Sequence, residues 1–244
     1  MKNETPNRHL WFPIILGVSL ILSSVIGSYT FYKVRSLEDF ISVTGSAKVK
    51  VKADHARFLL NITRNVTQSA VKTGYAQIEN DLKVVKNYFK VQGVPETALE
   101  ISQVFMDQNY DYSGQYRPEK DYTLRQTIEF NSSDVDKVAL MAKNTRSIID
   151  GGVLLNPQPV EYTISKLPEL RISLLSDAIA DAKARAQKMA ESAGNSVGSL
   201  KSASSGVVQV LPENSLEISD YGSYDTQKIN KEVMLTVRAS FNLK

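Results

Sequence analysis

The chain has 244 residues, of which 42% are hydrophobic and 23% are charged, a composition typical of a folded globular protein. Its 29 basic and 26 acidic side chains leave a net charge of +3, which is too small for the basic surface that nucleic-acid binding requires. The chain has no cysteine, and this excludes disulfides, thiolate nucleophiles and zinc sites built on sulfur.

An uninterrupted uncharged run occupies residues 10–32, between His9 and Lys33. At about 1.5 Å per residue, a helix of this length crosses a hydrocarbon core of roughly 30 Å. Aromatic residues stand near both ends of the run, where membrane interfaces favour them. We therefore predict a transmembrane signal anchor over residues 10–32, with residues 1–9 in the cytoplasm, residues 33–40 as a linker and residues 41–244 as a folded domain.

A cleaved signal peptide is the alternative interpretation of this segment, because small residues occur late in the run behind Lys2 and Arg8. An Ala-x-Ala cleavage site is missing, although Val25-Ile26-Gly27 is a weak substitute. Because the apolar run continues past that position, we favour the uncleaved anchor.

Residues 41–52 alternate strictly, with apolar or small residues at odd positions and polar residues, including three lysines, at even positions. This period of two predicts a half-buried strand. A second alternating run over residues 56–62 follows Ala53-Asp54-His55, so we expect a β-hairpin with one apolar side. Residues 233–243 repeat the pattern, and we expect this last strand to lie beside the first one.

The middle of the chain predicts helices and antiparallel strands in alternation. Apolar residues at spacings of three and four indicate a helix from a Thr67 or Ser69 cap to Gly93. Residues 99–112 and 122–131 read as an antiparallel pair. A helix to about residue 147 follows, with Ser133 or Asp134 as its cap. Residues 153–164 supply a strand that Pro157 and Pro159 interrupt or confine to an edge.

The last third predicts a long helix over residues 168–193, whose alanine-rich stripe permits close packing on a sheet or on another subunit. A strand over residues 197–210 and an exposed loop over residues 211–228 precede the final strand. The expected fold class is α+β, with antiparallel sheets whose helices pack on one face, preceded by one transmembrane helix. Residues 56–166 follow the βαββαβ order of a ferredoxin-like unit.

Signatures of catalysis and metal binding are weak in this sequence. His55 is the one imidazole outside the N-terminal region, and its expected place is a solvated turn. Oxygen ligands alternate as in an EF-hand loop at Asp107, Asn109, Asp111 and Ser113, but Tyr112 replaces the turn glycine and Glu119 lies one residue too late. A carboxylate enzyme using Asp107 and Asp111 is the weakest option. We predict no catalytic residue, no cofactor and no metal.

Tyrosines cluster in two loops, and they are the candidate interface or ligand-binding residues: Tyr110, Tyr112 and Tyr116 in one, and Tyr221 and Tyr224 in the other. A tyrosine ring buries apolar area while its hydroxyl stays hydrated, which suits a protein interface or a glycan surface. Packing between strands is the alternative role for these side chains.

Several short segments resemble SIMPL-domain proteins, a family of bacterial envelope proteins. They are Ile41-Ser42-Val43-Thr44-Gly45, Gly93-Val94-Pro95, the Tyr110-x-Tyr112 stretch with Tyr122, and the Ala180–Ala186 stretch of the long helix. The resemblance covers residues 40–244. It implies an α+β domain, export from the cytoplasm and ring-like or channel-like homo-oligomers, and it implies no catalytic residues. Members include periplasmic proteins linked to oxidative-stress defence.

From these observations we expect a single-pass protein of the bacterial inner membrane, held by residues 10–32 with its C-terminal domain in the periplasm. Secretion to the periplasm after cleavage is the alternative. The expected function is a structural or assembly role in the cell envelope, with stress defence as one such role. We expect the protein to form a homo-oligomer and not to bind nucleic acid. The alternative function is a small-ligand or glycan-binding module that uses the tyrosine-rich loops.

Overall fold

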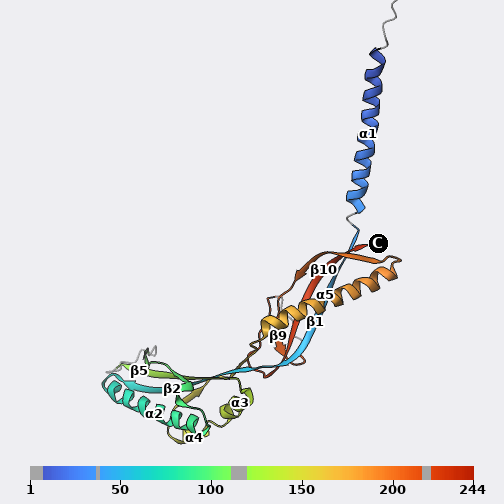
Figure 1. The fold of residues 1–244 in the computed structure, drawn as a ribbon. Helices are drawn as coiled ribbons and strands as arrows, with labels where there is room; N and C mark the ends of the chain where they lie inside the picture. The colour runs from blue at the N-terminus through green and yellow to red at the C-terminus, as the bar shows by residue number, and fades with distance from the viewer. Residues whose placement is uncertain (1–7, 37–38, 111–119, 216–220) are drawn as a thin grey trace, which may run out of the picture. The chain divides into compact units, whose positions relative to one another are not determined.

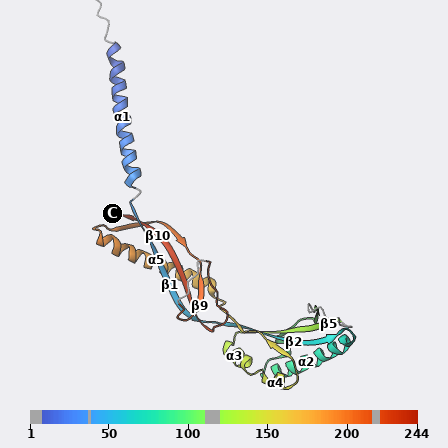
Figure 2. The same ribbon diagram turned by 180° about the vertical axis from the view of Figure 1, so that it is seen from behind.

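The computed structural model describes residues 8–36, 39–110, 120–215 and 221–244 (Figures 1 and 2). Its helices and antiparallel strands confirm the α+β class. The chain divides into two compact units. Unit 1 contains Met1–Ala47, Leu174–Gly206 and Leu235–Lys244, and unit 2 contains Lys48–Ser173 and Val207–Met234. The boundaries expected from the sequence, with residues 41–244 as one domain, stay a prediction.

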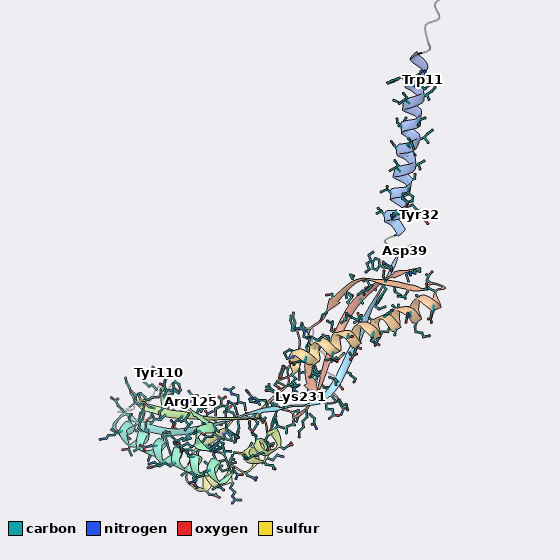
Figure 3. All side chains as sticks on the ribbon, in the orientation of Figure 1. Trp11, Tyr32, Asp39, Tyr110, Arg125 and Lys231 are labelled. Carbon is teal, nitrogen blue, oxygen red and sulfur yellow. The ribbon has the colours of Figure 1, made fainter. Side chains whose placement is uncertain are left out.

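The N-terminal helix α1 spans Arg8–Ser36. Its segment Trp11–Val34 is long and apolar enough to cross a membrane, and none of that segment is buried against the described protein. Trp11 and Tyr32 lie near the two ends of the helix and point outward (Figure 3). The Ser19 and Ser23 hydroxyls donate to backbone carbonyls one turn earlier in the helix, so these polar atoms are satisfied without water.

Unit 1 is built on a sheet in which the first and last strands of the chain are neighbours, as predicted. The strand order is β1 (Phe40–Lys52), β10 (Asn230–Leu243) and β8 (Val197–Ser205). The Leu243 N–H donates to the Asp39 carbonyl and the Ser240 hydroxyl donates to Ser42, which is an antiparallel register. Helix α5 (Leu167–Ser192) covers one face of this sheet (Figures 1 and 2).

Small residues bring α5 close to the sheet of unit 1. The buried core consists of Val43, Ala178, Ala182, Ala186, Val237, Ala239 and Phe241. Gly45 of β1 faces α5 so closely that an added Cβ would lie 2.2 Å from the Ala178 carbonyl oxygen. The adjacent Ser46 N–H donates to the Asp181 carboxylate at 2.8 Å, and this bond lowers the pKa of Asp181. The alanine stripe therefore packs on the sheet of its own chain.

Unit 2 contains a larger antiparallel sheet with the strand order β3-β5-β2-β6, where β4 also pairs with β5 and β7 with β2. The strands are β2 (His55–Thr67), β3 (Leu99–Ile101), β4 (Phe105–Asn109), β5 (Asp121–Ser132), β6 (Leu155–Pro157) and β7 (Glu161–Thr163). Strand β9 (Gln209–Pro212) pairs with residues 231–234 of β10. A ferredoxin-like assignment for residues 56–166 stays a prediction.

Helices α2 (Val71–Val91), α3 (Val135–Lys143) and α4 (Arg146–Asp150) pack on one face of the unit 2 sheet (Figure 1). Phe89 of α2 lies at the centre of the core, with ring centroids 5.5 Å from Tyr88, 5.6 Å from Phe130 and 6.3 Å from Phe58. Arg64 of β2 donates to both carboxylate oxygens of Asp81 in α2, at 2.6 and 2.7 Å. This fork fixes the helix against the sheet and raises the pKa of Arg64.

The predicted hairpin between residues 41–52 and 56–62 is wrong. β1 pairs with β10, whereas β2 pairs with β5, β6 and β7, so the two strands belong to different sheets. The Ala53 N–H donates to the Ile229 carbonyl, and the Asp54 carboxylate accepts bonds from the Ser165 N–H and hydroxyl at 2.8 and 2.6 Å. These bonds direct the chain from one sheet into the next.

Several element boundaries also differ from the predictions. The cap of α2 is Ala70, with no side-chain bond, because a short 3₁₀ turn (Gln68–Ala70) precedes the helix. Of the two predicted caps, Asp134 is the one that caps α3, since its carboxylate accepts from the Lys137 N–H, but the helix ends at Lys143 and α4 follows. The strand expected over residues 153–164 is interrupted, as predicted, into β6 and β7.

Candidate functional site

The three lysines at even positions of β1 each pair with a carboxylate in unit 2. The pairs are Lys48 with Glu232 at 3.2 Å, Lys50 with Glu213 at 2.6 Å and Lys52 with Asp136 at 2.5 Å. The partners belong to β10, to the end of β9 and to α3, so these lysines join three elements to one strand. The lysine side chains stay more than half exposed, whereas that of Glu232 is only 7% exposed. The alternation in the sequence places the three lysines on the polar face of the strand, and the structure adds these partners.

Lys231 is the one fully buried cation among the residues that the structure describes, and its side chain has no exposed area. Its ammonium group donates to the backbone carbonyl of Asp225 and lies 3.4 Å from the Asp225 carboxylate. Burial lowers the pKa of Lys231, and the nearby carboxylate opposes this shift. Asp225 also accepts bonds from the backbone N–H groups of Gln227 and Lys228, at 3.0 and 3.1 Å. The pair therefore anchors the loop before β10.

A surface hollow of about 530 Å³ lies next to this pair in unit 2. It is lined by Ala139, Lys143, Tyr162, Pro212, Glu213, Gln227, Lys228, Ile229 and Asn230. Tyr162, Ala139 and Ile229 also pack in or against the hydrophobic core, so the floor is apolar and the rim is polar. Burial raises the pKa of Tyr162, and the negative charge of Asp136 adds to this shift.

The predicted tyrosine residues occupy different environments. Tyr110, at the end of β4, is 69% exposed, and it lies at the same end of the unit 2 sheet as Arg125 (Figure 3). Tyr221 is 97% exposed, whereas the Tyr224 hydroxyl accepts a bond from the Ile164 N–H at 3.2 Å. Tyr112 and Tyr116 lie outside the described residues. The Tyr224 hydroxyl is thus engaged within its own chain, and an interface or ligand-binding role for these tyrosines stays a prediction.

Tyr110 and Tyr224 lie at opposite ends of β2. Asn109, next to Tyr110, pairs with Asp121, which pairs with Thr67 at the end of β2. Tyr224 bonds to the strand that pairs with His55, at the beginning of β2. Twelve residues at about 3.3 Å each separate these ends by roughly 40 Å. Among the described tyrosines, Tyr110 and Tyr224 are therefore too far apart to contact one small ligand together.

Of the candidate calcium ligands, the two that the structure describes lie on a β-strand and not in an EF-hand loop. Asp107 and Asn109 belong to β4, and Asp111, Ser113 and Glu119 lie outside the described residues. The Asp107 carboxylate pairs with Arg125 at 2.8 Å, and Asn109 accepts a bond from Thr123 at 3.0 Å. In the described parts of the chain, no group of three or more His, Asp or Glu side chains is placed to hold a metal ion.

His55 begins β2 and pairs with Thr163, so the prediction of a turn position for this residue is wrong. The buried lysine was missed, although a signal for it exists. The buried residues of the last strand, Val233, Leu235 and Val237, stand at odd positions, and Lys231 continues that series. A charged residue in the buried register of a strand indicates an internal ion pair.

Residues 41–241 match the model of the SIMPL family, which is described as protein of unknown function (DUF541). The chain belongs to the SIMPL family. The matched region begins in β1, ends in β10 and covers the sheets of both units, and it leaves out the apolar helix α1 of unit 1. No curated protein matches the chain. The family description of this SIMPL protein therefore carries no activity, and the function must be argued from the structure.

Proposed function

We propose that this SIMPL-family protein is held in a membrane by α1 as an uncleaved signal anchor, and that its folded part lies in the periplasm of a bacterial cell. There it has a structural or assembly role in the envelope as a homo-oligomer. A contribution to stress defence belongs to the same proposal and rests on the family resemblance alone.

The exposure of α1 is the observation that carries the anchor. The segment Trp11–Val34 contains many large apolar side chains, and each described one is more than half exposed. Full burial of one such side chain contributes roughly 1.5–3 kcal/mol, so leaving the whole segment in water is strongly unfavourable. A bilayer removes this cost, and the helix satisfies its own backbone bonds there. The charges on both sides of the segment are balanced, so the orientation rests on its N-terminal place.

The outer strand of unit 1 supports assembly. β8 pairs with β10 alone among the described strands, and its residues 199–205 are exposed. A long, flat edge strand presents unpaired backbone groups to other chains, and monomeric proteins protect such edges with charges, prolines or covering loops. β8 contains a single lysine and no proline. This edge is therefore suited to pairing with a strand of another subunit.

Introduced cysteines test the anchor, because the native chain has none. Thr73 is an exposed residue of α2, and Asn3 precedes α1. In intact cells whose outer membrane is permeable to the reagent, a maleimide that cannot cross the inner membrane should label Thr73→Cys and should leave Asn3→Cys unlabelled. Labelling of Asn3→Cys, or protection of Thr73→Cys, would contradict this orientation.

Substitution of the β8 edge tests the assembly surface. The Ser202→Lys and Ser204→Lys double variant adds two charges to the edge, and it should reduce the mass of the detergent-extracted particle measured by light scattering. The control adds the same charges on exposed positions of α2, as Thr73→Lys and Gln77→Lys, and should keep the native mass. A native chain that is monomeric at every concentration would rule out assembly.

A further inference from the structure

We infer that the hollow of about 530 Å³ in unit 2 is a binding site for a small organic carboxylate with a compact apolar body. The site is independent of the proposed envelope role. It uses Gln227 and Lys228 of the loop that carries Tyr221 and Tyr224, and neither tyrosine lines it. Its volume lies within the range of small-molecule pockets, roughly 300–1,000 Å³.

The charges around the hollow leave two cations without a counter-ion. The nearby carboxylates are already engaged, since Glu213 pairs with Lys50, Asp136 with Lys52 and Asp225 with Lys231. Lys143 and Lys228 both line the hollow. Neither makes an ion pair or side-chain hydrogen bond within the described part of the chain. The two free ammonium groups therefore give the rim a net positive charge that an anion would neutralise.

The floor of the hollow provides the apolar contact. Tyr162 is 7% exposed and belongs to the core of unit 2, while Ala139 and Ile229 pack against that core. The Pro212 ring adds a rigid wall, and α3 and β7 fix the positions of Ala139 and Tyr162. An apolar body placed on this floor would contact side chains that already pack in or against the core, which limits the entropic cost of ordering them on binding.

The available donors favour a carboxylate over a phosphate. Phosphate sites commonly use the fork of an arginine or the free backbone N–H groups at a helix N-terminus. The hollow has no arginine, and the backbone N–H groups of Gln227 and Lys228 already donate to Asp225. Lys143 stands in the last turn of α3, at the C-terminal end, whereas anions bind at the N-terminal end of a helix. The side-chain amides of Gln227 and Asn230, together with two ammonium groups, suit a single carboxylate.

Equilibrium dialysis of the full chain in lipid nanodiscs tests this site, with empty discs as the measure of partition into lipid. The probes are 2-naphthoate, which has both the apolar body and the charge, 2-naphthamide, which has the body alone, and 2-naphthyl phosphate. We expect 2-naphthoate to bind at least tenfold more tightly than the amide. We expect its affinity to fall severalfold between 50 and 500 mM salt, because the cations on the rim are exposed.

The Lys143→Gln and Lys228→Gln double variant should weaken 2-naphthoate binding at least tenfold and leave amide binding unchanged. The matched control, Lys72→Gln and Lys90→Gln on exposed positions of α2, should bind as the native chain does. Gln227→Glu, which adds a carboxylate to the rim, should also weaken 2-naphthoate. Three outcomes would each overturn the site. The double variant and its control could bind 2-naphthoate equally, 2-naphthoate could fail to bind at 10 mM, or it could bind no more tightly than the amide. Tighter binding of the phosphate ester would overturn its assignment to carboxylates.

Discussion

Replacement of the buried Lys231 separates the role of its charge from the role of its aliphatic stem. In Lys231→Met the stem is kept and the ammonium group is lost. Asp225 then still accepts the Gln227 and Lys228 N–H bonds, so its carboxylate stays partly compensated. In Asp225→Asn the Lys231 ammonium group instead stays fully buried and loses its counter-charge. The two substitutions break the same pair and leave different groups behind.

The expected costs follow from this difference. Lys231→Met loses charge-assisted hydrogen bonds worth about 1.5–3 kcal/mol but also removes the cost of burying an ammonium, so we expect a net loss of about 1–2 kcal/mol. Asp225→Asn should cost about 3–4 kcal/mol, because breaking a buried pair leaves an uncompensated charge. Lys231→Ala should cost about 2 kcal/mol more than the methionine variant, since about three buried methylene groups are lost.

Urea unfolding of the full chain in a mild detergent, followed by far-ultraviolet circular dichroism, measures these free energies. Fluorescence is unsuitable because the single tryptophan, Trp11, belongs to α1. Amide hydrogen exchange of residues 209–212 and 230–234 locates the effect at β9 and β10. The reasoning would be refuted if Asp225→Asn cost less than Lys231→Met, or if Lys231→Met had no effect on either measurement.

Four further substitutions test other parts of the structure. Gly45→Ala should destabilise unit 1 by more than about 2 kcal/mol in urea unfolding, because its Cβ would lie 2.2 Å from the Ala178 carbonyl oxygen. Tyr88→Phe should cost about 1 kcal/mol at pH 7 through loss of a buried hydroxyl bond. Burial raises the pKa of Tyr88 to about 12, because it disfavours the charged phenolate. The contribution of the neutral hydroxyl to folding stability should therefore be complete below pH 10 and be lost as the pH rises toward 12. The phenylalanine variant should not show this alkaline loss. Lys48→Met should destabilise the protein more than Lys50→Met, because the partner of Lys48 is nearly buried and the partner of Lys50 is not.

Each of these variants has a control in the same element. Thr44→Ala changes an exposed residue of β1 and should cost little, so an equal cost for Gly45→Ala would contradict the close approach of α5. Tyr75→Phe alters an exposed tyrosine of α2 and should leave the alkaline profile unchanged. Equal costs for the two lysine variants in urea unfolding would show that burial of the partner has no effect.

The alternation of residues 41–52 and 233–243 was enough to predict two neighbouring strands, but it was insufficient to identify the partner of residues 56–62. A period of two assigns side chains to faces and says nothing about which strand lies alongside. The link Ala53-Asp54 lacks the glycine or asparagine that a tight hairpin requires, and this absence argued against the hairpin. Long-range bonds, such as those of Ala53 with Ile229 and of Asp54 with Ser165, show where the chain goes.

The candidate site depends on contacts between residues far apart in the sequence, which local sequence patterns do not reveal. Lys48 and Glu232 are 184 residues apart, and their pairing follows from the contact between β1 and β10. The hollow joins residues of α3, β7, β9 and the loop before β10, which composition and spacing do not connect. The separation of Tyr110 from Tyr224 likewise follows from the register of β2, and the sequence indicated only that both lie in loops.

Native mass spectrometry of the complex extracted from its membrane tests the central claim, because it reports both the anchor and the assembly. We predict a particle whose subunits dissociate as intact chains of 27.1 kDa, with a total mass that is a multiple of this value. Subunits that begin after residue 27 would contradict the uncleaved anchor, and a particle with the mass of one chain would contradict the homo-oligomer.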